Sequence, residues 1–225
     1  MEGLFVVLGI AVFIAIAVFS WIAAENRRKA LAALAESWGF RWAGGGDPFG
    51  IEARYGGFAA LARGHSRAAS NVFHGTRNGR EAVCFDYKYV TGSGKNRHTH
   101  RLSGAIISLG VPTPRLCVRP EGFFDKIAEF VGMDDIDFES AEFSRTFHVT
   151  SDNRKFAFDV FHARAMEYML RLPRRFTMEL RGGQVMVHDD RTWDPADFDA
   201  AIRQVEGLAD LFPEYLKQAL REGTA

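Results

Sequence analysis

The apolar and polar positions divide the chain into one long apolar run and a series of shorter, patterned segments. Residues 3–24 carry no charged side chain, and Ser20 is the only polar side chain among them. As a helix, this run would extend about 33 Å, which is enough to cross the hydrocarbon core of a bilayer. A cleaved signal peptide has a basic start and a shorter apolar core, and a helix buried in a globular core is shorter and carries a polar stripe. We therefore predict an uncleaved transmembrane anchor at residues 1–24.

Charged residues beside the apolar run predict its orientation. Arg27, Arg28 and Lys29 follow it, whereas the N-terminal flank offers only the α-amino group and Glu2. Because basic residues are enriched on the cytoplasmic side of membrane spans, this asymmetry predicts that the N-terminus lies outside and the domain in the cytoplasm. Trp21 is typical of the interfacial aromatic belt, so we expect it at the membrane interface together with the three basic residues.

Helical spacing continues beyond the apolar run. Leu31, Leu34 and Trp38 recur at positions i, i+3 and i+7, and Gly39 is a natural stop. This pattern predicts a juxtamembrane helix at residues 25–39 that continues the anchor and packs one side on the following domain.

Alternating positions then predict an antiparallel meander over residues 70–119. Asn78-Gly79 lies between two strand-like runs and is a strong hairpin signal. We predict a third strand at residues 98–109 and a fourth at residues 116–119. Four large side chains alternate onto one face of the strand after the Asn-Gly turn: Val83, Phe85, Tyr87 and Tyr89.

Helical and strand patterns mix in the rest of the chain. We predict a short helix at residues 122–131, a strand at residues 146–150, and a hairpin of residues 176–180 with 184–188. Two helices between that strand and the hairpin contain Phe156 and Val160, and Met166, Met169 and Leu170, respectively; Ser151-Asp152 is the predicted cap region of the first.

The last helix has the clearest start signal. Asp194 is a typical N-cap, Pro195 suits the first helical position, and Trp193 and Phe198 are spaced as a hydrophobic staple. Pro213 should kink or split this helix.

These elements predict an α+β fold, with an N-terminal transmembrane helix followed by a domain of antiparallel β-meander and packed helices. Strand and helix do not alternate regularly, which disfavours a doubly wound parallel sheet. Since no polar linker interrupts residues 40–225, we predict one domain there, while sub-lobes at residues 40–120 and 121–225 remain an alternative.

Composition excludes several classes of function. The chain has 28 basic and 28 acidic residues, so no basic field indicates nucleic-acid binding. Cys84 and Cys117 are too few for a disulfide scaffold, and in a reducing cytoplasm they should be buried thiols. If the domain lay outside the cytoplasm, an alternative that stays open, these two cysteines could form a disulfide.

Two short segments offer candidate chemistry. The sequence of residues 92–95 resembles the end of a P-loop, but the required flanking residues and a following helix are missing, so we interpret it as a hairpin turn. His98 and His100 are spaced two apart on a predicted strand, so both rings point the same way and could share a metal, with Asp86 or His74 as a third ligand. A polar sheet face near an edge is the simpler interpretation of this pair.

Several motifs together resemble a known group of proteins. They are residues 71–75 (Asn-Val-Phe-His-Gly), residues 85–87 (Phe-Asp-Tyr) and the segments 119–127, 135–139 and 142–149. The chain is similar at these positions to a family of uncharacterised bacterial membrane proteins with one N-terminal anchor. The resemblance covers most of the chain outside the anchor; it implies the architecture and a bacterial inner (plasma) membrane but no activity.

The sequence thus favours a non-enzymatic binding or scaffolding module that recognises a protein partner or a lipid headgroup and uses no cofactor. The alternative is a metal-dependent, hydrolase-like enzyme built on the His98 and His100 strand. Because no catalytic motif survives inspection, we predict no catalytic residue.

Overall fold

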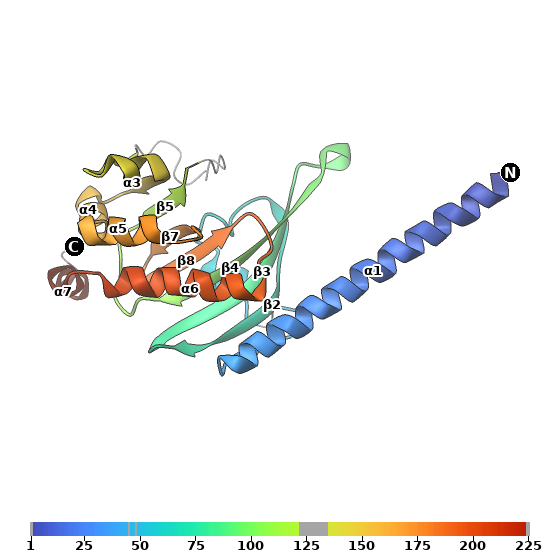
Figure 1. The fold of residues 1–225 in the computed structure, drawn as a ribbon, viewed down its shortest axis with the longest axis horizontal. Helices are drawn as coiled ribbons and strands as arrows, with labels where there is room; N and C mark the ends of the chain where they lie inside the picture. The colour runs from blue at the N-terminus through green and yellow to red at the C-terminus, as the bar shows by residue number, and fades with distance from the viewer. Residues whose placement is uncertain (1, 45, 48, 122–134, 224–225) are drawn as a thin grey trace.

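The chain begins with one continuous helix, α1 (Glu2–Ser37), that projects away from the rest of the protein (Figure 1). The structure, a computed structural model, describes residues 2–44, 46–47, 49–121 and 135–223. Val7–Ser37 is long and apolar enough to cross a membrane, and its most apolar stretch is not buried against the protein. Phe13 and Phe19 are 73% and 74% exposed, as expected for side chains that face lipid rather than a core. The far end of the helix is different, because Leu31 and Ala35 are buried in the domain.

One antiparallel sheet of eight strands forms the centre of the domain, in the order β1-β2-β3-β4-β8-β7-β5-β6. The predicted hairpins are confirmed: β2 pairs with β3 across Asn78-Gly79, and β7 pairs with β8 across Gly182-Gly183. The strands are β1 (Arg41–Trp42), β2 (His65–Arg77), β3 (Arg80–Thr91), β4 (His98–Ser108), β5 (Leu116–Pro120), β6 (Phe147–Ser151), β7 (Thr177–Arg181) and β8 (Gln184–Asp189).

Helices and loops cover both faces of this sheet. One core cluster contains the C-terminal end of α1 and residues of the helices α3, α4, α5, α6 and α7. The long helix α6 lies across the sheet in Figure 1. The other cluster contains α2 and the face formed by Val83, Phe85, Tyr87 and Tyr89, which are buried as the alternation predicted. The helices are α2 (Ile51–Tyr55), α3 (Ala141–Thr146), α4 (Arg154–Val160), α5 (Ala163–Arg171), α6 (Pro195–Asp210) and α7 (Glu214–Glu222), and η1 (Gly94–Asn96) is a single 3-10 turn.

Helix starts and stops follow local side-chain chemistry. A capping box joins Asp194 and Asp197 at the start of α6, Pro195 stands in its first turn, and Trp193 packs on Phe198 with ring centroids 5.0 Å apart. The chain breaks at Pro213 and resumes as α7, as predicted.

Some predictions about the elements were wrong or incomplete. The fourth strand of the meander, β5, does not pair with β4, because β8 and β7 lie between them. The cap of α4 is Asn153, whose side chain accepts a hydrogen bond from the Phe156 amide, rather than Ser151 or Asp152. The short helices α2 and α3 were not predicted, and the predicted helix at residues 122–131 lies outside the described residues.

Candidate functional site

Besides the buried Leu31 and Ala35, α1 contacts the sheet through one ion pair. Arg27 Nε lies 2.8 Å from Asp86 Oδ2, and Arg27 Nη2 lies 2.7 Å from Asp86 Oδ1. The two side chains are only 24% and 10% exposed. Two parallel charge-assisted hydrogen bonds between a guanidinium and a carboxylate fix orientation as well as distance. The helix therefore meets the sheet at a defined point and in a defined rotation.

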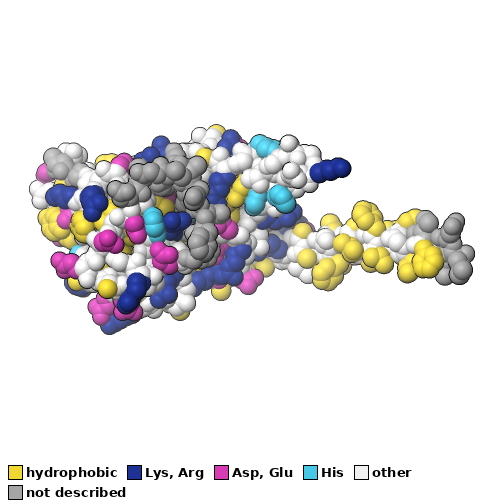
Figure 2. All heavy atoms as spheres, turned by 90° about the horizontal axis from the view of Figure 1, so that it is seen from above, with side chains coloured by type: hydrophobic (Ala, Val, Ile, Leu, Met, Phe, Trp, Pro, Cys, Tyr) yellow, Lys and Arg dark blue, Asp and Glu magenta, His cyan; other side chains and the backbone are white. Residues whose placement is uncertain are grey.

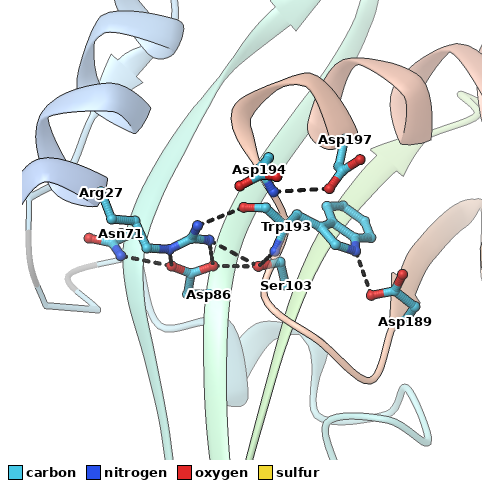
Figure 3. Close-up of polar contacts among 8 residues, drawn as sticks. All are labelled: Arg27, Asn71, Asp86, Ser103, Asp189, Trp193, Asp194 and Asp197. Carbon is cyan, nitrogen blue, oxygen red and sulfur yellow. Dashed lines mark hydrogen bonds and ion pairs between the residues drawn. The ribbon is translucent and has the colours of Figure 1, made fainter. Parts of the chain in front are cut away.

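Further hydrogen bonds surround this ion pair (Figure 3). Asn71 Nδ2 donates to Asp86 Oδ2 at 2.8 Å, and Ser103 Oγ donates to Asp86 Oδ1 at 2.5 Å. Arg27 Nη1 donates to the Trp193 carbonyl oxygen at 2.6 Å. We call these five residues, Arg27, Asn71, Asp86, Ser103 and Trp193, the junction. It brings together α1, three adjacent strands and the segment that precedes α6.

Local backbone geometry places Asn71 in the junction. The pairing of β2 with β3 is irregular between Ser70 and Phe73, as in a β-bulge. Within this irregularity Asn71 has a φ of +51°, a conformation that asparagine tolerates better than most residues. The bulge thus turns the amide toward Asp86, which the alternation of β3 directs to the face opposite Phe85 and Tyr87.

The junction continues into the start of α6. The Trp193 amide donates to Ser103 Oγ at 2.9 Å, and the Trp193 indole Nε1 donates to Asp189 Oδ1 at 2.6 Å. Arg174 donates to Asp189 Oδ2 at 2.8 Å and also pairs with Asp197, the residue that closes the capping box of α6. Trp193 is fully buried. The direction of α6 is therefore tied to the same polar network that holds α1.

This arrangement fixes the orientation of α1 on the sheet. The carboxylate of Asp86 is paired with a guanidinium and accepts hydrogen bonds from an amide and a hydroxyl, and the five junction residues include no histidine or cysteine that could act as a base or thiol nucleophile. A part-buried charge satisfied in this way makes the geometry costly to change.

The predicted membrane-interface residues divide into two groups. Arg27 turns to the domain, whereas Arg28 and Lys29 lie on the surface and pair with Glu25, at 2.8 Å and 3.7 Å. Trp21 is 68% exposed on the apolar part of α1. Their location at the membrane interface stays a prediction. The structure shows in addition that Arg27 pairs with Asp86 of the domain.

The two predicted metal ligands lie at the end of the β3–β4 hairpin. The His100 ring stacks on Tyr89, with centroids 4.7 Å apart, and its Nε2 lies 2.7 Å from Thr91 Oγ1. The structure brings neither considered third ligand to this pair. Asp86 lies on the opposite face of β3, and His74 is level with Val83, six residues along β3 from Tyr89. Within the described ranges no group of three or more His, Cys, Asp and Glu side chains could hold a metal ion.

A cavity of about 320 Å³ lies between α2 and the strands β2 and β3. The centroid of the Phe49 ring lies 4.5 Å from that of the His74 ring, and the Arg54 guanidinium carbon also lies 4.5 Å from the Phe49 centroid. Burial, together with the positive charges of Arg41 and Arg54, holds the pKa of His74 below its ordinary value, so its ring is neutral at neutral pH. Among the described residues that line this cavity, no hydrogen bond joins a hydroxyl group to His74 or Glu81.

Fold and junction together define an α+β domain fixed to a long apolar helix of the kind that anchors proteins in membranes. A crystal structure with a similar fold is that of the mycobacterial trehalose monomycolate transport factor A, TtfA, with a TM-score of 0.62 and 16% sequence identity; the match covers 83% of this chain and 94% of that chain. At this identity the likeness shows the fold alone. No family model matches the chain, and a search of the curated proteins finds no match.

Proposed function

We propose that this chain is a non-enzymatic binding or scaffolding module that holds its α+β domain in a fixed orientation relative to its anchor helix, at the cytoplasmic face of a membrane, as an accessory to a membrane transport system. The observation that carries the proposal is the junction. A tether would need no such network, because a flexible linker keeps a domain at a membrane equally well. On this proposal the part-buried Arg27–Asp86 pair, together with the buried Leu31 and Ala35, joins the helix and the domain as one unit.

The basic residues after the apolar stretch support the cytoplasmic orientation. The positive-inside preference counts Lys and Arg positions and is not a net-charge rule, so the pairing of Arg28 and Lys29 with Glu25 does not weaken it. Both cysteines are free and buried, which is compatible with a reducing compartment.

The structural likeness supports the link to transport. The similar crystal structure is that of a transport factor, and the likeness covers nearly its whole length. On this proposal the partner of our chain is an integral membrane protein of a transport system, which contacts both the apolar helix and the domain. A scaffold of this kind requires that the contact surface on the apolar helix and the contact surface on the domain keep a constant angle to each other around the helix axis.

Alanine insertions in α1 test this requirement. Two alanines between Ala23 and Ala24 rotate the apolar part of the helix by about 200° relative to the junction, whereas four give a net rotation of about 40°. The full-length protein is cross-linked in its native membranes and purified, and the membrane proteins attached to it are identified. We expect the wild type and the four-alanine variant to capture the same transport protein and the two-alanine variant to lose it.

The three forms should unfold at the same temperature, since the insertion leaves the junction intact. Equal capture by both variants would contradict a scaffold of fixed angle. Protein that captures no membrane protein but contains stoichiometric metal, lost on His98→Ala, would replace the proposal with the enzyme alternative.

A further inference from the structure

The β3–β4 hairpin extends beyond the other strands, on the side of the domain from which α1 projects (Figures 1 and 2). The Arg27–Asp86 ion pair joins α1 to β3, and both the helix and the hairpin extend outward from it. From Asp86 to Thr91 the strand advances about 17 Å, whereas from Arg27 back to Trp21 the helix advances about 9 Å. The two diverge in Figure 1, but both run to the same side of the domain, so with α1 in a membrane the hairpin tip points toward the headgroups near the C-terminal end of the apolar stretch.

The charge of this hairpin is entirely of one sign. Residues 87–120 contain no Asp or Glu, although the whole chain has equal numbers of acidic and basic residues. We call residues 88–101 the basic hairpin; its exposed basic side chains are Lys88, Lys95, Arg97 and Arg101. None of these four has a salt-bridge partner among the residues that the structure describes, whereas Arg63, Arg67, Arg77 and Arg80 each pair with an acidic side chain.

The end of the basic hairpin is held in shape by its own contacts. Besides the stacking of Tyr89 on His100, His65 Nε2 lies 3.0 Å from the Gly92 carbonyl oxygen. Gly92 has a φ of +69°, and a Cβ there would lie 2.1 Å from the Asn96 carbonyl oxygen, so this tight turn requires glycine. The basic side chains are therefore presented on a preformed support, and little backbone entropy is lost when they bind.

We propose that the basic hairpin binds the headgroups of anionic phospholipids beside the anchor. Its location on the side of the domain from which α1 projects and its unpaired positive charge both favour a membrane surface over a protein partner. Each Lys or Arg close to an anionic membrane surface strengthens binding about fivefold at physiological ionic strength. The inference rests on the proposed function only for the anchoring of α1, and it names the lipid headgroup as one ligand of the module.

A fluorophore at the hairpin tip tests this binding in the full-length protein. Cys84 and Cys117 are buried, so a thiol-reactive dye attaches at the exposed Ser93→Cys position. The protein is reconstituted in nanodiscs with headgroup spin-labelled lipid as quencher, either in phosphatidylcholine alone or with phosphatidylglycerol added. We expect strong quenching only with phosphatidylglycerol, and its loss at high salt, where surface charges are screened. A dye at Glu214→Cys, on α7 at the other end of the domain, should stay unquenched in both (Figure 1).

Charge variants complete the test. The double variant Lys95→Gln with Arg97→Gln removes two basic residues, each of which strengthens binding about fivefold. It should therefore reduce the ratio of membrane-bound to unbound hairpin by roughly 25-fold. Lys155→Gln with Arg164→Gln, which also removes two exposed basic side chains, should leave it unchanged. Equal quenching with and without phosphatidylglycerol, or quenching that appears only when a membrane protein is added, would overturn the inference. Partner capture that persists while the lipid contact fails would leave the proposed function standing.

Discussion

Replacing Arg27 by alanine should be the most damaging single change at the interface of helix and domain. The substitution leaves the Asp86 carboxylate, 10% exposed, with only Asn71 and Ser103 as hydrogen-bond donors. Removing one partner of a buried ion pair costs about 3–5 kcal/mol, because the remaining charge has lost its compensation. Since the Arg27 side chain is 24% exposed and water can reach part of the space it leaves, we expect the lower end of that range.

A loss of about 3 kcal/mol corresponds to a decrease in Tm of roughly 6–12 °C for a domain of this size. The assay is thermal unfolding of the full-length protein in detergent micelles, followed by tryptophan fluorescence, to which the buried Trp193 of the junction contributes, and by circular dichroism. Arg27→Lys keeps the charge but loses the bidentate geometry, so its Tm should lie between those of wild type and Arg27→Ala.

The matched control is Arg28→Ala, which removes the same side chain one residue further on. Among the residues that the structure describes, Arg28 pairs only with Glu25, on the surface, so the Tm should not change measurably. The double variant of Arg27→Ala with Asp86→Ala should be more stable than the sum of the single changes predicts, because neither charge is left alone. If Arg27→Ala unfolds at the same temperature as Arg28→Ala, the junction does not hold the helix and the reasoning fails.

Three further predictions follow from burial and packing. Gly75→Ala places a Cβ 2.5 Å from the Phe40 ring and should lower the Tm measurably, whereas Gly79→Ala, with open space around it, meets only the strain of its positive φ. Burial raises the pKa of Tyr87 to about 12; since the folded pKa lies above the unfolded one, this tyrosine stabilises the fold below about pH 10 and loses that contribution as the pH rises to 12. Tyr87→Phe should therefore flatten the fall of Tm over that interval, and an unchanged slope would contradict the assignment. Burial likewise raises the pKa of the Cys117 thiol to about 12, so a thiol reagent should modify it only after denaturation, as judged by mass spectrometry.

Local sequence signals predicted the parts of the fold that depend on neighbouring residues. The Asn78-Gly79 turn, the capping box that starts at Asp194 and the break at Pro213 each involve residues within a few positions of one another. The order of strands in the sheet depends instead on contacts between residues that are distant in the sequence. Nothing local indicates that β8 pairs with β4, because their Ser103↔Asp189 register joins residues far apart in the chain. This is why the fourth strand of the meander was misplaced.

The junction could be seen only in part from the sequence. Arg27 was predicted as a membrane-interface residue, not as a contact of the domain, and Asn71 and Asp86 stand in the two short motifs that suggested a family resemblance. The contact between Arg27 and Asp86 was not predictable, because the two residues are 59 positions apart in the sequence. A charged residue is also normally expected to be exposed to solvent. The backbone bulge that turns Asn71 toward Asp86 has no clear sequence signal apart from the asparagine itself.

The two inferred contacts with the membrane explain why a rigid junction is useful. A single helix in a bilayer can tilt and rotate about its axis, and its tilt is set by whatever anchors flank it. The Arg27–Asp86 pair transmits that motion to the whole domain, so it does not fix the height or the direction of the domain by itself. A second contact away from the helix axis, at the basic hairpin, removes the remaining rotation. The junction and the basic hairpin therefore act together: without the first, the hairpin would hold only a loosely attached domain, and without the second, the domain would turn with the helix.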